Sequence, residues 1–274
     1  MKLKDRVALV TGGGQGLGKA IALALARKGA SVAVCDINEQ TLASTVGEIE
    51  AAGARSLGIK CDVSSSDAVR RMFVTIKEQF GTLHVLVNNA ALVPVTPEDE
   101  KRRNRHYAYV TTPMPRQSLG IVTSLTDDDW LRWWGVNVHG VFFCTREALK
   151  LMEPQRYGKI VNIASVAGIS TASAHSPGYS ASKAAVVSFT KTCALDVAGA
   201  NIYVNAIACG GVMTPPFEAY LAKASEEQKR ILYQMVPLGR VGLPEEYASL
   251  AVYLASDEHY LVGQIISPNG GLVI

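Results

Sequence analysis

The sequence has little of what disulfide-rich or metal-binding proteins need. Its five cysteines are odd in number and scattered, and no Cys-x-x-Cys pair occurs among them. They indicate free thiols in a reducing compartment rather than disulfides or a zinc site. The five histidines are equally dispersed, so we expect no metal ion.

Charge and hydrophobic length argue against two further classes. The formal net charge is only +3 over 274 residues and is not clustered, so we expect no nucleic-acid partner. No apolar run is long enough to span a bilayer, and no signal-type segment precedes the first expected strand. We therefore expect a soluble, cytoplasmic protein that acts on a small molecule and binds no membrane.

Short apolar runs alternate with amphipathic ones along the whole chain. Strands are expected at residues 6–11, 31–35, 56–61, 83–88, 159–164, 201–207 and 264–267. Helices are expected at roughly residues 16–28, 39–52, 66–80, 127–152, 178–199 and 244–256, with a substrate lid at about 213–235. Gly29, Gly53 and Gly81 follow helix ends, where a left-handed cap favours glycine.

The order of these elements predicts an α/β fold. We expect residues 1–274 to form a single-domain, Rossmann-like, doubly wound parallel sheet of about seven strands with helices on both faces. The strands read as continuous apolar runs, as expected when helices cover both sides of a sheet. No internal repeat or domain break is visible.

The first expected turn is rich in glycine. Thr11-Gly12-Gly13-Gly14-Gln15-Gly16-Leu17-Gly18 follows a strand and opens a helix, where backbone amides and the helix dipole favour a phosphate group. The dinucleotide pattern G-x-G-x-x-G is not met in any frame. Residues 13–19 fit the P-loop spacing, but Ala20 replaces the Ser or Thr that would bind magnesium, which argues against a nucleoside triphosphatase. A glycine-rich turn without a ligand is the alternative.

Asp36 ends the second expected strand, at the spacing where an acidic residue binds an adenosine ribose. A carboxylate accepts hydrogen bonds from both ribose hydroxyls and repels a 2′-phosphate. At about 4 Å and an effective dielectric constant near 20, each unit of like charge costs roughly 4 kcal/mol. No lysine or arginine occupies residues 13–15 or 37–38, so NAD is favoured over NADP. Alternatively, Asp36 caps the next helix.

A second group of polar residues follows the fifth expected strand. Tyr179 and Lys183 stand four residues apart, so on a helix both project from one face. Ser176-Pro177 is a good start for that helix. Ser165 closes the strand at 159–164, and we expect its hydroxyl to share a crevice with the Tyr/Lys pair.

Two hydrolase patterns fail. Ser180-Ala181-Ser182-Lys183 fits the Ser-x-x-Lys of serine acylases, but the partner motifs Ser-Asp-Asn and Lys-Thr-Gly are absent. No Gly-x-Ser-x-Gly elbow occurs either. A hydrolase is therefore excluded as the interpretation of this site.

Together these motifs resemble the short-chain dehydrogenase/reductase family. The motifs are Thr11-Gly12-x-x-x-Gly16-x-Gly18, Asn88-Asn89-Ala90, Asn137, Ser165, Tyr179-x-x-x-Lys183, Arg240-x-Gly242-x-Pro244-Glu245, and Gly263-Gln264 with Asn269-Gly270-Gly271. The resemblance covers nearly the whole chain. Three positions depart from the family pattern, namely Ala91, Cys209 and Asn269, and Cys209 could alter the loop beside nicotinamide.

The resemblance implies a nicotinamide cofactor and a four-residue catalytic set, Asn137, Ser165, Tyr179 and Lys183. The cofactor-binding residues it implies are Gly12, Gln15, Gly16, Leu17, Gly18, Asp36, Ile37, Asp62, Val63, Asn89, Ala90, Ala91, Tyr179, Lys183, Val212 and Thr214. Asn88 is expected along the adenosine ribose as well. A homotetramer is usual in the family.

The chemistry of these groups agrees with the family role. Tyrosine has a reference pKa near 10, which a neighbouring ammonium and a positive nicotinamide could lower by roughly 2–3. We expect Tyr179 to act as acid and base, Lys183 to tune it and bind the nicotinamide ribose, and Ser165 to hold the substrate oxygen. Asn137 is expected to anchor a water in a proton relay; alternatively, it satisfies backbone groups.

Residues 92–126 form an insertion where relatives usually have a short loop, which indicates a lid or binding loop. Thr96-Pro97 begins a short polar helix, and the basic residues 101–103 and 105 are expected on a solvated face. Otherwise they meet an anionic substrate group or a neighbouring subunit. The expected substrate contacts are Ser165, Ile169, His175, Tyr179 and Phe217, with Pro216 and Tyr220 beside them, although a surface position is an alternative for His175.

The sequence as a whole predicts an NAD-dependent alcohol dehydrogenase/ketone reductase. Its expected substrate is a secondary alcohol, small and cyclic or aromatic, or the corresponding ketone. One alternative is a reductase of 3-oxoacyl thioesters, with the basic cluster receiving a phosphopantetheine or carrier protein. The other is a non-catalytic regulator that binds nicotinamide.

Overall fold

Seven strands form one parallel sheet in the computed structural model, which describes residues 3–274. The strand order is β3-β2-β1-β4-β5-β6-β7. The strands are β1 (Val7–Thr11), β2 (Ser31–Asp36), β3 (Ser56–Lys60), β4 (Val85–Asn88), β5 (Gly158–Ser165), β6 (Ile202–Cys209) and β7 (Ile265–Ile266). The parallel sheet of the expected α/β fold is confirmed, and each strand lies within two residues of its expected bounds.

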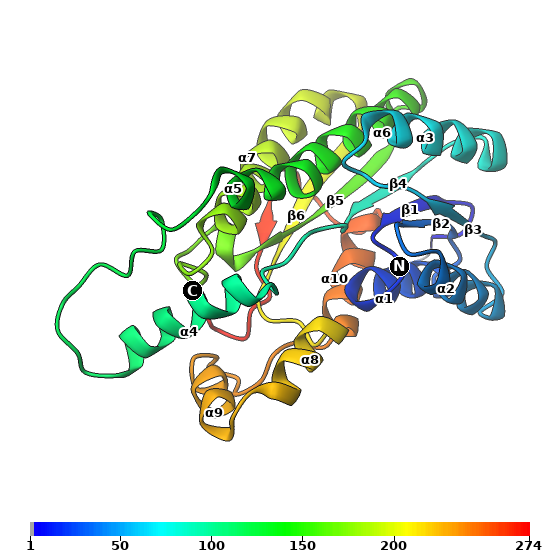
Figure 1. Cartoon of the computed structure of the whole chain (residues 1–274). Helices are drawn as coiled ribbons and strands as arrows, with labels where there is room; N and C mark the ends of the chain where they lie inside the picture. Colours follow the sequence, from blue (N-terminus) through cyan, green and yellow to red (C-terminus); the bar gives the residue numbers. More distant parts are fainter. Residues whose placement is uncertain (1–2) are drawn as a thin grey trace.

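The helices connect successive strands (Figure 1). The α-helices are α1 (Gly16–Arg27), α2 (Glu39–Ala51), α3 (Ser66–Phe80), α4 (Pro97–Thr111), α5 (Asp127–Trp134), α6 (Val141–Gln155), α7 (Pro177–Val197), α8 (Pro215–Lys223), α9 (Glu226–Gln234) and α10 (Pro244–Ala255). A π-helix, η1 (Gly135–Gly140), joins α5 to α6, and short 3-10 turns lie at η2 (Val166–Gly168) and η3 (Ala198–Ala200). None of the helices within residues 3–274 combines the length and apolar character that crossing a membrane requires.

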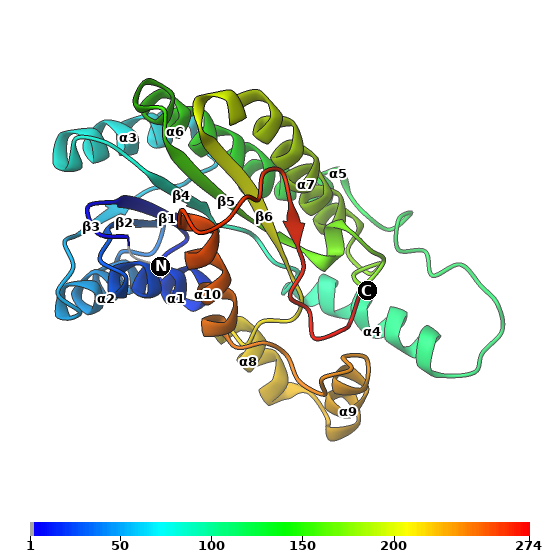
Figure 2. The ribbon, with the colours of Figure 1, turned by 180° about the vertical axis from the view of Figure 1, so that it is seen from behind.

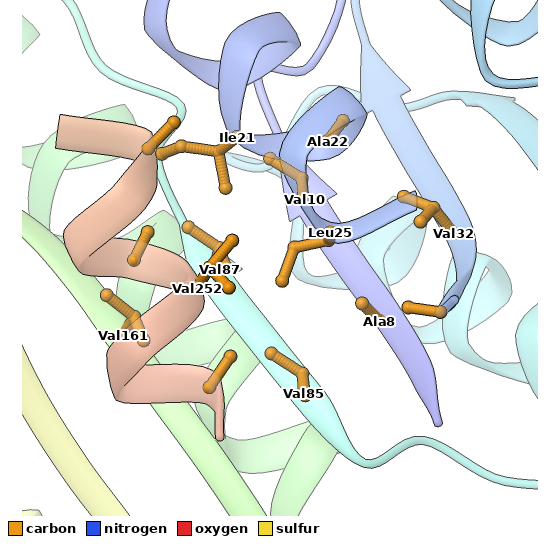
Figure 3. Packing of buried hydrophobic residues seen from close by; sticks show 14 of the residues in the cluster. Ala8, Val10, Ile21, Ala22, Leu25, Val32, Val85, Val87, Val161 and Val252 are labelled. Carbon is orange, nitrogen blue, oxygen red and sulfur yellow. The ribbon is translucent and has the colours of Figure 1, made fainter. Parts of the chain in front are cut away.

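Alternate residues of each strand pack on opposite faces of the sheet. Ala8 and Val10 of β1 join the side chains of α1, α2 and α10, as Figure 3 shows for Ile21, Leu25 and Val252. Val7, Leu9 and their neighbours pack instead against α3, α6 and α7. Both faces are therefore covered, which is why the strands are apolar without alternation.

The order of the strands sets the position of a crevice. Strand β1 pairs with β2 on one side and with β4 on the other. The loops after β1 and β4 consequently diverge at the carboxyl edge of the sheet, the point where doubly wound folds bind ligands. Gly12 follows β1 and Asn89 follows β4, so both lie at this edge.

The helix expected at 127–152 is interrupted. It consists of α5, the π-helix η1 and α6, because Asn137 forms hydrogen bonds to segments outside the helix, as described below. The expected lid likewise forms two helices, α8 and α9, separated by Ala224 and Ser225. Local periodicity could not show either break.

The insertion contains α4, beyond which residues 112–126 extend as a long loop from the body of the domain (Figures 1 and 2). The start of α4 is a capping box, in which Thr96 and Asp99 exchange side-chain and backbone hydrogen bonds. Asp99 is fully buried and accepts hydrogen bonds from Arg102 at 3.0 Å and from Arg132 of α5 at 2.9 Å. This buried ion pair holds α4 against α5.

Candidate active site

One large cavity lies at the carboxyl edge of the sheet. Its volume is about 1160 Å³, above the roughly 300–1,000 Å³ typical of a site for one small ligand. It therefore has room for a dinucleotide and a substrate together. Residues that follow β1, β2, β4, β5 and β6 line it, together with side chains of α4, α8 and α9.

The glycine-rich turn forms one wall of the cavity at the start of α1. Gly12 has a φ of +62°, and a Cβ there would lie 2.8 Å from the Cα of Ala90. A Cβ on Gly18 would lie 2.1 Å from the carbonyl oxygen of Gly12. Gln15, the N-cap residue of α1, makes no side-chain capping hydrogen bond, so the first amides of the helix have no such partner. The turn therefore fits a pyrophosphate.

Hydrogen bonds between the ends of β1 and β4 hold this turn in place. The hydroxyl oxygen of Thr11 accepts hydrogen bonds from the backbone N–H groups of Asn89 and Ala90, each at 3.0 Å. The Asn89 amide donates to the carbonyl oxygens of Thr11 and Gly12, again at 3.0 Å. The two loops that flank the cavity are thus fixed to each other.

Asp36 lies at the edge of the turn, at the end of β2. Its Oδ2 accepts from the Gly14 N–H and its Oδ1 from the Asn38 N–H, both at 3.0 Å. Asn38 is the residue that caps α2, through its own side chain. The alternative reading of Asp36 as the helix cap is therefore wrong, and its carboxylate lines the cavity instead.

The structure brings all the expected cofactor-binding residues to the cavity wall. They are Gly12, Gln15, Gly16, Leu17, Gly18, Asp36, Ile37, Asp62, Val63, Asn89, Ala90, Ala91, Tyr179, Lys183, Val212 and Thr214. Asn88 is the exception among the expected ribose contacts. It is buried behind the wall, where its amide donates to Asn162 at 2.8 Å and to Thr145 at 3.1 Å, so it is a structural residue.

Ser165, Tyr179 and Lys183 also line the cavity and come from two elements. Ser165 ends β5 and its Oγ accepts from the Ala167 N–H at 3.1 Å. Lys183 is buried, and its Nζ donates to the carbonyl oxygen of Ile163 at 2.8 Å. The helical spacing of Tyr179 and Lys183 on α7 places both beside the end of β5, as the sequence predicts.

Burial governs the protonation of this group. It raises the pKa of Tyr179 to about 12, while the Ser165 hydroxyl beside the phenol lowers it and Cys209 raises it further. Burial also lowers the pKa of Lys183, to about 8, so the lysine is still an ammonium near pH 7. The lowering of the Tyr179 pKa by this ammonium together with a bound nicotinamide stays a prediction. The buried thiol of Cys209 has its pKa raised to about 12, so it is neutral. Tyr179 is therefore a neutral phenol near pH 7.

Asn137 lies behind the cavity wall rather than on it. Its Oδ1 accepts from the Leu92 N–H at 2.8 Å, and its Nδ2 donates to the Leu92 carbonyl oxygen and to Ser182, each at 3.1 Å. Ser182 in turn donates to the carbonyl oxygen of Tyr179 at 2.7 Å. Asn137 thus joins the segment after β4 to the turn of α7 that carries Tyr179.

Trp133 packs against Tyr179 behind the cavity wall, a contact that the sequence analysis did not identify. Its ring lies edge-on to that of Tyr179, with centroids 5.5 Å apart, and is almost completely buried. Gly178 permits this approach, since a Cβ there would lie 2.4 Å from the indole. The available signal was the spacing of Trp133 and Asn137, which are four residues apart and share a helix face.

The substrate end of the cavity differs in part from expectation. Phe217 and His175 line it, but Ile169 does not and its side chain is 40% exposed, so its expected contact is wrong. His175 is only 4% exposed, which excludes the alternative of a surface histidine. Burial lowers its pKa to about 4, with a further contribution from the Arg103 charge.

The basic cluster of α4 is not a uniformly solvated face. Lys101 is exposed and pairs with Glu98, as expected. Arg102 is buried in its ion pair with Asp99, and Arg103 lines the cavity, so that expectation is wrong for these two. The acidic partners of Arg102 lie partly on α5, 27 residues away, which local sequence could not indicate.

The arrangement is suited to hydride exchange chemistry with a bound dinucleotide. A glycine-rich turn at a helix start, a carboxylate at the end of β2 and a phenol with a buried ammonium line one cavity. In the described residues, 3–274, no group of three or more His, Cys, Asp or Glu side chains is placed to hold a metal ion. A nicotinamide dinucleotide fits this set of donors and acceptors.

Comparisons with known proteins agree with this geometry. The short chain dehydrogenase family model matches residues 6–225. The chain is 36% identical to the 3-oxoacyl-[acyl-carrier-protein] reductase FabG of Thermotoga maritima, with 100% of both chains covered. It is 34% identical to a 3beta-hydroxysteroid dehydrogenase of Mediterraneibacter gnavus, covering 98% of this chain and 95% of that protein.

Solved structures show the same architecture. A levodione reductase matches with a TM-score of 0.85 at 28% identity, covering 98% of each chain. An NAD+-bound xylitol dehydrogenase matches with a TM-score of 0.84 at 28% identity, covering 99% of this chain and 100% of that one. The chain belongs to the short-chain dehydrogenase/reductase family of oxidoreductases, which bind a nicotinamide cofactor.

Proposed function

We propose that the protein is an NAD-dependent oxidoreductase that interconverts a secondary alcohol and its ketone. The observation that carries this proposal is that Ser165, Tyr179 and Lys183 line the same cavity as the glycine-rich turn. A phenol and a hydroxyl beside a nucleotide site suit the proton transfer that accompanies hydride transfer. The substrate is a small molecule, cyclic or aromatic in shape.

NAD rather than NADP is the proposed cofactor. The Asp36 carboxylate is held at the cavity wall by the amides of Gly14 and Asn38, so it cannot easily rotate away. It suits the two hydroxyls of an unmodified ribose and repels a 2′-phosphate. The NAD+-bound xylitol dehydrogenase among the structural neighbours supports the same choice.

Each residue of the catalytic set would have a separate role in the reaction. The bound nicotinamide supplies or accepts the hydride. Tyr179 donates its phenolic proton to the carbonyl oxygen during reduction and takes the proton back during oxidation, while the Ser165 hydroxyl orients that oxygen. Lys183, fixed by Ile163, stabilises negative charge on the phenol oxygen and binds the nicotinamide ribose. Asn137 holds the turn of α7 that carries Tyr179 through Ser182. Its expected role in anchoring a water of a proton relay stays a prediction.

A neutral Tyr179 at pH 7 suits the reduction direction, because the phenol carries the proton that a carbonyl oxygen needs. The high pKa of about 12 comes mainly from burial, and a positively charged nicotinamide, when bound in the cavity, would lower it in the oxidation direction. Oxidation of the alcohol should therefore become faster as pH rises, whereas reduction of the ketone should not.

The second candidate is a reductase of 3-oxoacyl thioesters. The reductase of Thermotoga maritima and a second one of Synechocystis, each 36% identical to the chain, carry that name. Against it stands the basic cluster of α4, because Arg102 is buried in an ion pair and is not available for a carrier protein. A non-catalytic regulator is the least favoured reading, since the catalytic set is intact.

A spectrophotometric screen tests the proposal. A panel of secondary alcohols, ketones and 3-oxoacyl thioesters is assayed with both cofactors, and absorbance of the reduced nicotinamide is followed. The proposal expects turnover of an alcohol and ketone pair with NAD, at a higher kcat/KM than with NADP. Turnover of thioesters alone would favour the second candidate, and binding of NAD without any turnover would favour the regulator.

Assembly and location are proposed from the family resemblance and the cysteines. We expect a homotetramer, which sedimentation or light scattering would measure. All five cysteines are free and buried, which suits the reducing cytoplasm.

A further inference from the structure

Helix α4 closes one end of the cavity. In Figures 1 and 2, α4 lies beyond the carboxyl ends of the central strands and apart from α1, which packs along one face of the sheet. Glu100, Arg103, His106, Tyr107 and Val110 all line the cavity. They recur every three or four residues, so one face of the helix is turned toward the ligand space.

Arg103 has hydrogen-bonding capacity that the protein does not use. Its Nη1 donates to the carbonyl oxygen of Pro94 at 3.2 Å, and its guanidinium lies 4.5 Å from the ring centre of Tyr220. Its Nε is buried without a partner. Within residues 3–274 no carboxylate lies at ion-pair distance from Arg103, whereas the neighbouring Arg102 pairs with Asp99.

His175 has a second unused polar atom in the same cavity. The residue is 96% buried, and its Nδ1 has no hydrogen-bond partner. The rings of Tyr107 and His106 lie 6.0 and 6.1 Å away and enclose it. A buried polar group left unpaired costs about 1–3 kcal/mol, so two such groups on one cavity wall indicate a ligand that pairs with them.

We propose that Arg103 and His175 bind a carboxylate carried by the substrate, so that the substrate is a hydroxy acid or the corresponding oxo acid. The inference rests on the proposed function, in which Tyr179 exchanges a proton with the substrate oxygen, and it adds the class of substrate. The guanidinium of Arg103 donates to a carboxylate oxygen in the planar geometry that carboxylates favour. The neutral ring of His175 donates one further N–H.

Charge and spacing select a compact monoanion. Among the cavity-lining residues of α4 and α8, Arg103 and Lys223 carry two positive charges and Glu100 carries one negative charge, which leaves one positive charge in excess on these two helices. His175 lies two residues before α7 and four before Tyr179, so their Cα atoms are roughly 6–13 Å apart, between the helical and the extended limits. A ring or a short alkyl chain spans such a distance between the carboxylate and the reacting carbon.

Two probes of the same shape test the subsite: 4-oxocyclohexanecarboxylate, which is an anion, and its neutral carboxamide, both reduced with NADH. The wild type is expected to have a kcat/KM for the acid at least about tenfold above that for the amide. Arg103→Met keeps the alkyl stem and removes the charge. It should lower kcat/KM for the acid at least about tenfold more than it lowers kcat/KM for the amide.

Lys101→Met is the matched control on the same helix, because Lys101 is exposed and pairs with Glu98 outside the cavity. This variant should leave kcat/KM for the acid and kcat/KM for the amide unchanged. His175→Asn should lower kcat/KM for the acid more than that for the amide. Equal turnover of acid and amide by the wild type, or an equal loss for both in Arg103→Met, would overturn the inference, as would a preference for acyl thioesters over both probes.

Calorimetric titration with benzoate, with and without NADH, separates this inference from the proposed function. If neither ketone is reduced but benzoate binds the wild type and not Arg103→Met, the subsite stands and the oxidoreductase proposal fails. If neutral ketones are reduced but benzoate does not bind the wild type, the proposed function stands and the carboxylate subsite is wrong.

Discussion

Replacing Asp36 by asparagine should weaken the discrimination between NAD and NADP. The substitution removes one negative charge and retains the size of the side chain and one acceptor oxygen. That oxygen can still accept from Gly14 or Asn38, which the two carboxylate oxygens do at 3.0 Å in the structure. The other backbone N–H loses its acceptor, so the substitution removes the charge together with one hydrogen bond.

The expected magnitude follows from Coulomb's law. One unit charge at about 4 Å from another, at an effective dielectric constant near 20, repels it by roughly 4 kcal/mol. Asp36 is only half-buried, and ions within a Debye length of about 8 Å reduce the repulsion at physiological salt. A residual repulsion of about 1.4–3 kcal/mol corresponds to a preference of roughly 10- to 150-fold for NAD.

The assay is the ratio of kcat/KM with NADH to that with NADPH, using one ketone substrate. Asp36→Asn should lower this ratio at least about tenfold, mainly through faster use of NADPH. Glu39→Gln is the matched control, because Glu39 is an exposed acid three residues away that pairs with Lys60 at 3.2 Å. The ratio of the wild type should also fall as salt concentration rises.

An unchanged ratio in Asp36→Asn would refute the assignment of this carboxylate to the ribose. An equal fall in Glu39→Gln would show that the general negative field, and not the position of Asp36, sets the preference.

Three further predictions concern the turn, α4 and the buried histidine. Gly18→Ala should abolish NADH binding in a fluorescence titration, because the new Cβ would overlap the carbonyl oxygen of Gly12. Circular dichroism should show that the variant is folded. NADH binding at wild-type affinity would contradict the assignment of the glycine-rich turn to the pyrophosphate. Asp99→Ala removes the buried carboxylate that Arg102 and Arg132 share and leaves them only their longer contacts to Asp129. Hydrogen exchange of α4 amides should therefore speed up at least about tenfold, and Glu98→Ala should have no such effect. The folded-state pKa of His175, about 4, lies below its ordinary 6.5, so the neutral ring contributes stability above pH 6.5 that is lost as pH falls through 4. His175→Gln should remove up to about 3 kcal/mol of that pH dependence in urea unfolding, and parallel curves for the two proteins would contradict the burial.

The fold could be predicted because its signals are local. Gly81 is the left-handed cap of α3, and Pro177 is the first residue of α7, so these helix ends follow from single residues. The apolar strands pack on both faces, and their number and order along the chain define a doubly wound sheet. The cavity-lining residues after β1, β2 and β4 could also be predicted, because each group comes immediately after a strand.

The parts that the sequence could not predict depend on distant contacts. The π-helix around Asn137 is held by Leu92 and Ser182, each 45 residues away in sequence. Arg102 is buried because Asp129 lies beside it, and His175 is buried because α4 covers it. From sequence alone a charged residue or a histidine is predicted to lie on the surface, because the position of the enclosing insertion, residues 92–126, is not known.

The pKa of Tyr179 illustrates the same limit. Proximity to Lys183 in sequence suggests a lowered value, but the ammonium is turned to the carbonyl oxygen of Ile163 and both groups lie in a desolvated wall. The spacing of four residues predicts which side chains share a helix face. It does not predict how burial and neighbouring charges shift the pKa of each side chain.

The most direct test of the account is the turnover of Tyr179→Phe with the best alcohol and ketone pair from the screen. The account predicts that kcat falls by roughly 10²–10⁴-fold in both directions while the dissociation constant for NADH changes less than about threefold. A variant that keeps more than about a tenth of the wild-type kcat would contradict the role of the phenol as acid and base.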